Sequence, residues 1–125
     1  MAKKFKIAQN PTFKADVKVP RIGGAYDVVG FEYTFIPRKE LAGLYDSWRD
    51  KASTLEINED SKLIDLTEFE VDLQTQQIMD IVIGWAFEDV FNEDNVRMLV
   101  ESCAAAPSAI IDGFQSAYVK AKEGN

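Results

Sequence analysis

The sequence contains no histidine and a single cysteine, Cys103. Without histidine, the chain cannot form serine–histidine or cysteine–histidine nucleophilic sites, or the zinc sites that include histidine. A single thiol also excludes an intrachain disulfide, a CxxC redox pair and a four-thiolate metal site. We therefore expect a binding or structural protein and not an enzyme, with no catalytic residue, no cofactor and no metal.

Long apolar runs are lacking as well. The longest, Ile81–Phe87, lies between two acidic residues and is far shorter than the ~20 residues needed to cross a bilayer. The basic start of the chain resembles the beginning of a signal peptide, but Gln9-Asn10-Pro11 interrupts it before an apolar segment of the needed length. We expect a soluble protein that stays in the compartment where it is made.

Basic residues are scarce outside the amino-terminal region. Residues 1–21 carry a charge of +5, whereas residues 22–125 carry −12, which gives the whole chain −7. This balance argues against nucleic acid or an anionic membrane as the main partner. The asymmetry itself has two interpretations: unlike patches that join copies of the chain head to tail, or a lysine-rich solvent face that protects an edge strand.

Two segments near the amino terminus alternate apolar and polar residues. Phe13–Val19 and Val29–Phe35 each show the period of a half-buried strand. Gly23-Gly24 supplies turn residues between them, so we expect an antiparallel ribbon. Lys4–Ile7 is a candidate for a short third strand.

Beyond the ribbon the period changes to that of a helix. Recurring apolar residues predict a helix over residues 38–53. Residues 56–65 are polar and acidic and are predicted to form a loop. Thr67 and Glu70 have the spacing of a capping box, which predicts that a second helix begins there.

The second predicted helix becomes apolar around most of its circumference toward its end. Such a segment either lies at the centre of the domain or offers one side to another molecule. Burial within the chain is the more common case for a single domain, and a surface for a partner or for self-association is the alternative. The candidate residues for that surface are Ile78, Ile81, Val82, Trp85, Phe87 and Phe91.

Asp80 is an acidic residue within this apolar stretch. A buried carboxylate at this position would need a partner, and the simpler interpretation places it, exposed, at the rim of the helix. No pair of carboxylates stands out from the acidic background, so we expect no acid–base site.

Two further helices are predicted in the carboxy-terminal third. Asn92 is a capping residue followed by acidic residues, so a helix should begin directly after it. Cys103 continues the apolar face of this helix and is predicted to be a small core residue. Pro107 lies near the first turn of the last helix.

The predicted elements add up to an α+β fold. An amino-terminal antiparallel β-ribbon is followed by about four helices. The length fits one domain over residues 1–125. Within it we expect a basic β-ribbon region at residues 1–37 and an acidic helical region at residues 38–125.

A longer pattern runs through residues 83–118. A tryptophan ends one helix, a short turn leads to a capped helix start, and a linker of small residues precedes the last helix. The residues that carry it are Trp85, Phe91-Asn92-Glu93-Asp94-Asn95-Val96, Leu99, Ala104-Ala105-Ala106-Pro107, Ala109-Ile110, Phe114, Ala117 and Tyr118. This pattern resembles the tail assembly chaperones of long-tailed bacteriophages and prophages. The strands and the Pro37–Leu41 segment are also similar to that family.

The resemblance implies a role without catalysis. Such chaperones bind the long, largely helical tape measure protein in the host bacterial cytoplasm, keep it soluble, and help tail tube protein subunits assemble around it. They are absent from the mature virion, and family members often also occur in a longer, frameshifted form. We therefore expect the tape measure and tail tube proteins as partners, together with a homo-oligomer. The alternative is a structural subunit of a phage tail or another virion component.

Overall fold

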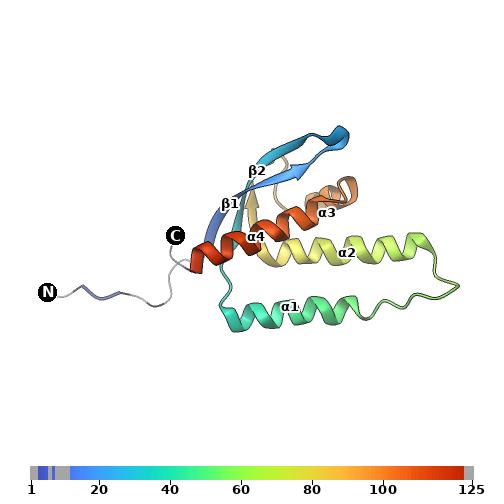
Figure 1. Cartoon of the computed structure of the whole chain (residues 1–125), viewed down its shortest axis with the longest axis horizontal. Coiled ribbons are helices and arrows are strands. Elements are labelled where there is room, and N and C mark those ends of the chain that lie inside the picture. Colours follow the sequence, from blue (N-terminus) through green and yellow to red (C-terminus); the bar gives the residue numbers. More distant parts are fainter. Residues whose placement is uncertain (1–2, 6, 8–11, 123–125) are drawn as a thin grey trace.

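Seven helices and strands follow one another along the described part of the chain (Figure 1). The computed structural model describes residues 3–5, 7 and 12–122. The elements are β1 (Thr12–Pro20), β2 (Tyr26–Thr34), α1 (Arg38–Ala52), α2 (Leu63–Ile81), β3 (Val82–Trp85), α3 (Glu93–Ser102) and α4 (Ala106–Lys122), with a short 3-10 turn at Ile22–Gly24. Three antiparallel strands and four helices confirm the predicted α+β fold class.

β1 and β2 form the predicted antiparallel ribbon. Their register places Val17 opposite Val29, and both side chains are buried. Because side chains alternate between the two faces of a strand, this register gives the ribbon one apolar and one polar face. The turn between the strands holds Gly23 and Gly24 at φ values of 87° and 83°, a left-handed conformation that glycine adopts without strain.

The third strand, β3, comes from a segment that was predicted to be helical. Sequence periodicity assigned Val82 and Trp85 to the second helix, and this prediction is wrong. α2 ends at Ile81, and the chain continues directly as a strand that pairs with β2, with Phe31 opposite Trp85. β-branched residues followed by a glycine disfavour helix, and the free edge of β2 supplies hydrogen-bonding partners for a strand.

Two other sequence predictions differ from the structure. The candidate strand at Lys4–Ile7 is not formed by its described residues, and Lys6 lies outside the described residues. α2 begins at Leu63 instead of Thr67, so the acidic loop is shorter than predicted. Its first turn is closed by backbone N–H groups that donate to the carbonyl oxygen of Lys62. The prediction relied on a side-chain cap at Thr67 and therefore placed the start of α2 too late in the chain.

The remaining helix boundaries agree with the sequence. α1 spans almost the predicted range. The side chain of Asn92 caps α3, accepting a hydrogen bond from the backbone N–H of Asn95 at 2.8 Å. Cys103 packs against the core as predicted, and its thiol donates to the carbonyl oxygen of Pro20 at 2.9 Å. Pro107 is the second residue of α4, where its missing N–H costs nothing.

α4 covers the inner face of the sheet and lies directly beneath β1 and β2 in Figure 1. Two tyrosine hydroxyls fix it in place. Tyr33 Oη donates to the carbonyl oxygen of Ile110 at 2.8 Å, and Tyr118 Oη donates to that of Ile36 at 2.7 Å. Tyr33 is fully buried, and this burial raises the pKa of its phenol above the ordinary value.

At Gly113, α4 approaches the sheet very closely. A Cβ atom at this position would lie 2.8 Å from Cγ2 of Val17 and 3.0 Å from Oη of Tyr33. These distances are shorter than ordinary carbon contacts of about 3.5–4.0 Å. The absence of a side chain at Gly113 therefore sets the spacing between the helix and the sheet.

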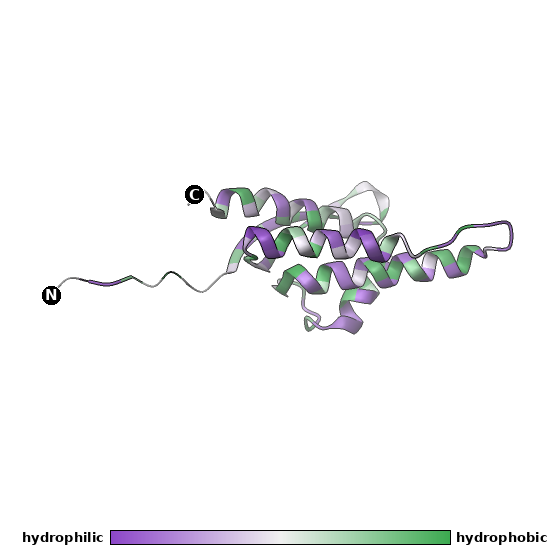
Figure 2. Cartoon of the chain, turned by 90° about the horizontal axis from the view of Figure 1, so that it is seen from below, coloured by the Kyte–Doolittle hydropathy of each residue, from purple (hydrophilic) through white to green (hydrophobic). Residues whose placement is uncertain are grey.

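α1 is the outermost layer, on the side of α2 that faces away from the sheet (Figure 1). Seen from below, the helices of this side carry hydrophilic and hydrophobic residues interspersed along their length (Figure 2). Trp48 of α1 donates its indole N–H to Oδ2 of Asp80 at 2.8 Å, and Gln76 donates to Oδ1 at 2.8 Å. Asp80 is thus half-buried and has two hydrogen-bond partners. This lies between the two interpretations of the sequence, which placed Asp80 either exposed at the rim of the helix or buried with a partner.

Candidate partner-binding surface

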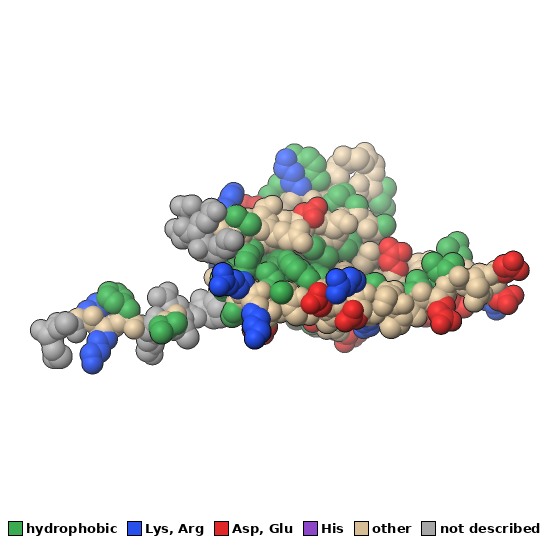
Figure 3. Space-filling view, turned by 60° about the horizontal axis from the view of Figure 1, so that its bottom comes forward, with side chains coloured by type: hydrophobic (Ala, Val, Ile, Leu, Met, Phe, Trp, Pro, Cys, Tyr) green, Lys and Arg blue, Asp and Glu red, His purple; other side chains and the backbone are tan. Residues whose placement is uncertain are grey.

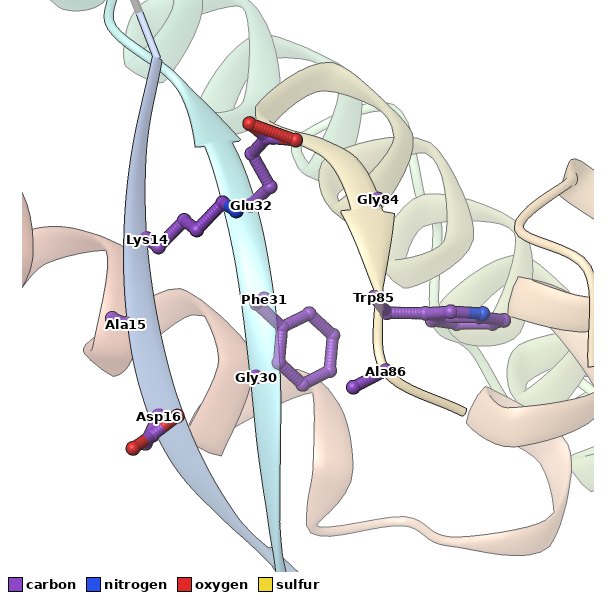
Figure 4. A pocket seen from close by; sticks show the side chains of 9 residues that line it. All are labelled: Lys14, Ala15, Asp16, Gly30, Phe31, Glu32, Gly84, Trp85 and Ala86. Carbon is purple, nitrogen blue, oxygen red and sulfur yellow. The ribbon is translucent and has the colours of Figure 1, made fainter. Parts of the chain in front are cut away.

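A hollow lies on the outer face of the sheet (Figure 4). It has a volume of about 590 Å³, and Gly30 and Gly84 are among the residues that line it. Lys14 points toward its cross-strand partner Glu32, and Asp16 lies further along β1 opposite Gly30. Among the described residues, no three His, Cys, Asp or Glu side chains gather to hold a metal ion. The hollow has the character of a solvated sheet face.

An aromatic cluster formed by Trp85, Phe87 and Phe91 occupies the turn between β3 and α3. The Trp85 ring lies 5.0 Å from Phe87 and 5.1 Å from Phe91, both edge-to-face, which is a favourable arrangement for aromatic pairs. Phe31 of the core contacts Trp85 and Phe87 from the sheet side. The indole N–H of Trp85 donates to the carbonyl oxygen of Asp89 at 2.8 Å, which closes the turn.

The six residues of the predicted surface divide into two sets. Ile78 and Ile81 have no exposed surface, and Val82 is 2% exposed, so these three belong to the core. The aromatic cluster is half-buried and packs against that core. A partner therefore has access to the aromatic cluster without a rearrangement of the fold, and its use as a binding surface stays a prediction.

Exposed apolar side chains extend this surface. Val90, in the same turn as the aromatic cluster, is 70% exposed, and Ile83 of β3 is about half exposed. Apolar side chains of this size that face solvent beside an aromatic cluster are typical of protein-binding surfaces. The sequence analysis missed Val90 because a single valine among acidic residues has no periodic pattern.

Two more groups of exposed apolar residues lie at the other connections of the chain. The hairpin-tip patch consists of Ile22, Tyr26 and Val28 at the turn of the β-ribbon. The helix-connection patch consists of Ile57, Leu63 and Ile64, between α1 and α2. Neither was predicted from the sequence. The only feature of the sequence that could have indicated them is a large apolar residue isolated within a glycine-rich or acidic turn.

The two patches differ in charge. At the hairpin tip, Nζ of Lys18 lies 5.0 Å from the centre of the Tyr26 ring, and Arg21 forms an ion pair with Asp27 at 3.2 Å. The connection between α1 and α2 contains four acidic residues and one lysine within residues 55–66. Figure 3 shows these red acidic side chains around green hydrophobic ones at the projecting end of the molecule.

A comparison with protein families identifies the chain. The family model for phage tail assembly chaperones matches residues 1–125, which is the whole length of the sequence. The chain belongs to the phage tail assembly chaperone family. Comparisons with curated proteins and with solved structures gave no significant match. This tail assembly chaperone, in its described residues, has no helix of the length and apolar character needed to span a membrane.

Proposed function

We propose that this tail assembly chaperone binds the tape measure protein, keeps it soluble, and promotes assembly of the tail tube protein around it. The observation that carries the proposal is the family match over the whole chain. Exposed apolar side chains on a body with a net charge of −7 also support it. A holding chaperone needs an apolar contact surface together with enough like charge to keep the complex dissolved.

The aromatic cluster and Val90 form the contact surface in this proposal. A tape measure protein is largely helical, and an amphipathic helix presents apolar residues at intervals of three and four positions. Aromatic side chains with one buried and one exposed edge suit such a contact, because they offer a large apolar area with little loss of conformational entropy. The chaperone would act by binding alone, with no catalytic step.

The proposed setting is the host bacterial cytoplasm before the tail is complete. The chaperone would associate with further copies of itself, hold the tape measure protein until tube subunits replace it, and then leave. It would therefore be absent from the mature virion.

Co-expression tests the proposal. The tape measure protein of the same phage should be mainly insoluble when expressed alone, and its soluble fraction should rise several-fold with the wild-type chaperone. Val90→Asp should lose most of this effect, because a carboxylate would have to be buried in the apolar contact. Val119→Asp is the matched control, since Val119 is 47% exposed but lies on α4. Val119→Asp should raise the soluble fraction of the tape measure protein as much as the wild-type chaperone does.

Two results would contradict the proposal. One is a tape measure protein whose solubility is the same with and without the wild-type chaperone. The other is detection of the chaperone at the copy number of a structural protein in purified phage particles, by quantitative mass spectrometry.

A further inference from the structure

A groove of about 510 Å³ lies between β1 and α4, and β2 contributes no residue to its lining. The order of the sheet is β1-β2-β3, so β1 pairs with β2 on one side and with no described strand on the other. The groove therefore runs along the unpaired edge of β1. We propose that an extended segment of another protein binds in this groove as an additional strand, antiparallel to β1. This site goes beyond the tape measure contact proposed above, because that contact takes a helix.

The backbone of β1 directs hydrogen-bonding groups to its unpaired edge. In an antiparallel pair, successive residues point their N–H and C=O groups alternately toward the paired strand and away from it. The N–H of Arg21 donates to the carbonyl oxygen of Ala25 across the turn that leads into β2. Every second residue back from Arg21 therefore faces β2. The residues between them face the unpaired edge, namely Lys14, Asp16 and Lys18.

Two other hydrogen bonds agree with this assignment. Gly30 lies opposite Asp16, and its carbonyl oxygen accepts from the segment after β3, so this pair faces away from the β1–β2 seam. Pro20 is the next residue of β1 that faces outward, and its carbonyl oxygen accepts from the thiol of Cys103. The edge is thus occupied at Pro20, and the groups of Lys14 and Asp16 are directed into the groove.

The polar side chains of β1 lean away from this edge. Lysines on an edge strand commonly hinder the addition of another strand. Here Lys14 points across β2 (Figure 4), and Nζ of Lys18 lies 5.0 Å from the centre of the Tyr26 ring, which also belongs to β2. Oδ1 of Asp16 would lie 3.6 Å from a Cβ atom at Gly30, again over β2. These side chains therefore do not obstruct the edge.

The opposite wall of the groove is made by small residues of α4. Side chains of an added strand would alternate between this wall and solvent. A wall of small residues leaves space for apolar side chains such as valine on the inward positions. The residues of this wall are Gly113, Ser116, Ala117 and Ala121.

The groove has an acidic end and a basic end. Asp16 and Asp112 line one end, and Lys14 and Lys120 line the other. Neither Asp112 nor Lys120 forms an ion pair with another described residue. Because β1 runs from the basic end to the acidic end, an antiparallel strand matches these charges when a basic residue precedes an acidic one. The expected partner is an extended segment of alternating apolar and polar residues in that order.

A synthetic peptide tests the site without any other phage protein. The probe is acetyl-Thr-Val-Lys-Val-Glu-Val-Thr-amide with a fluorescent label, and fluorescence polarisation measures its binding to the full chain. Ser116→Trp should weaken binding roughly tenfold or more, because the indole takes the place of a buried valine of the peptide. Val119→Trp is the matched control on α4, since Val119 does not line the groove. Circular dichroism checks that both variants remain folded.

Methylation of single peptide amides tests the strand pairing itself. In the proposed register the lysine and glutamate of the peptide lie opposite Asp16 and Lys14, so their N–H groups donate to β1. N-methylation of these two residues should weaken binding roughly tenfold or more through the lost hydrogen bonds. N-methylation of the central valine should have little effect, because its N–H points away from β1.

Hydrogen exchange measured by NMR locates the contact. The peptide should slow exchange of the amides of Lys14 and Asp16 and leave that of Ala15 unchanged, because Ala15 already faces β2. Three results would overturn the proposal: no binding at millimolar peptide, equal effects of the two kinds of methylation, or protection of Lys14 and Asp16 that rises with chain concentration in the absence of peptide. The last result would assign the edge to a second copy. Tape measure binding is tested separately by Val90→Asp, so failure of this site and failure of the chaperone function are distinguishable.

Discussion

Gly113→Ala and Gly43→Ala introduce the same methyl group into two helices, and we expect changes in stability of opposite sign. Gly43 lies within α1, and a Cβ atom at this position would meet nothing within 4 Å. Alanine there should stabilise the protein by roughly 0.5–1 kcal/mol, because glycine loses more backbone entropy on entering a helix. Gly43→Ala thus calibrates the helix-propensity gain in this chain.

At Gly113 the same gain is outweighed by crowding. The new methyl group would lie 2.8 Å from Cγ2 of Val17 and 3.0 Å from Oη of Tyr33. Val17 is β-branched and buried, and Tyr33 is held by its hydrogen bond to Ile110, so neither side chain moves away cheaply. Overpacking of this kind costs about 1–3 kcal/mol, so we expect a net destabilisation of about 1–2 kcal/mol.

Urea unfolding followed by circular dichroism measures both changes on the same scale. The double variant Val17→Ala with Gly113→Ala supplies a further check. Removing Cγ2 of Val17 relieves the closest contact, so the added cost of Gly113→Ala should fall in that background. If Gly113→Ala stabilises the protein as much as Gly43→Ala does, the expected crowding is refuted, because α4 would then have space for a methyl group beside Val17 and Tyr33.

Three other predictions concern the aromatic cluster, a buried phenol and a helix cap. Trp85→Ala should destabilise the protein by roughly 3 kcal/mol, because it removes edge-to-face contacts and the bond to Asp89; an unchanged melting temperature with lost tape measure binding would instead assign Trp85 to the interface alone. Burial raises the pKa of Tyr33 in the folded state, so the stability that its neutral phenol contributes is complete below pH 10, the ordinary pKa of tyrosine. This contribution is lost as the pH rises from 10 toward the higher pKa of the folded state. Tyr33→Phe should remove this part of the alkaline loss of stability, which a pH series of urea unfolding curves measures. Asn92→Ala should cost about 1 kcal/mol through loss of the α3 cap, whereas Asn92→Ser should retain most of it, and equal losses in the two variants would argue against the capping bond.

Local features of the fold were predictable from the sequence. The ribbon follows from alternation on either side of Gly23-Gly24, and α3 begins where Asn92 predicts. Both depend on residues close together in the chain. The strand β3 was not predictable in this way, because a short apolar run fits a helix or a strand equally well. The free edge of β2, reached through the pairing of Phe31 with Trp85, decides between them.

The same distinction explains the outcome for the candidate surface. The segment from Ile78 to Phe91 is apolar on most sides, so its sequence does not indicate which side is covered. In the structure this segment is shared between the end of α2, β3 and the turn after β3. Ile78 and Val82 enter the core, while Trp85 lies at its margin. The hairpin-tip and helix-connection patches were missed for the opposite reason. Isolated apolar residues in turns have no period, and their exposure depends on the surrounding fold.

The ties between the sheet and α4 have a consequence for how the chain folds. Tyr33 and Ile110 are 77 positions apart, and Tyr118 and Ile36 are 82 apart. During synthesis the ribbon is therefore complete long before the helix that covers it leaves the ribosome. Contacts at such separation also slow folding. This chaperone must keep its own apolar sheet from aggregating until the last helix arrives, so even a modest truncation at the carboxy terminus should trap it unfolded.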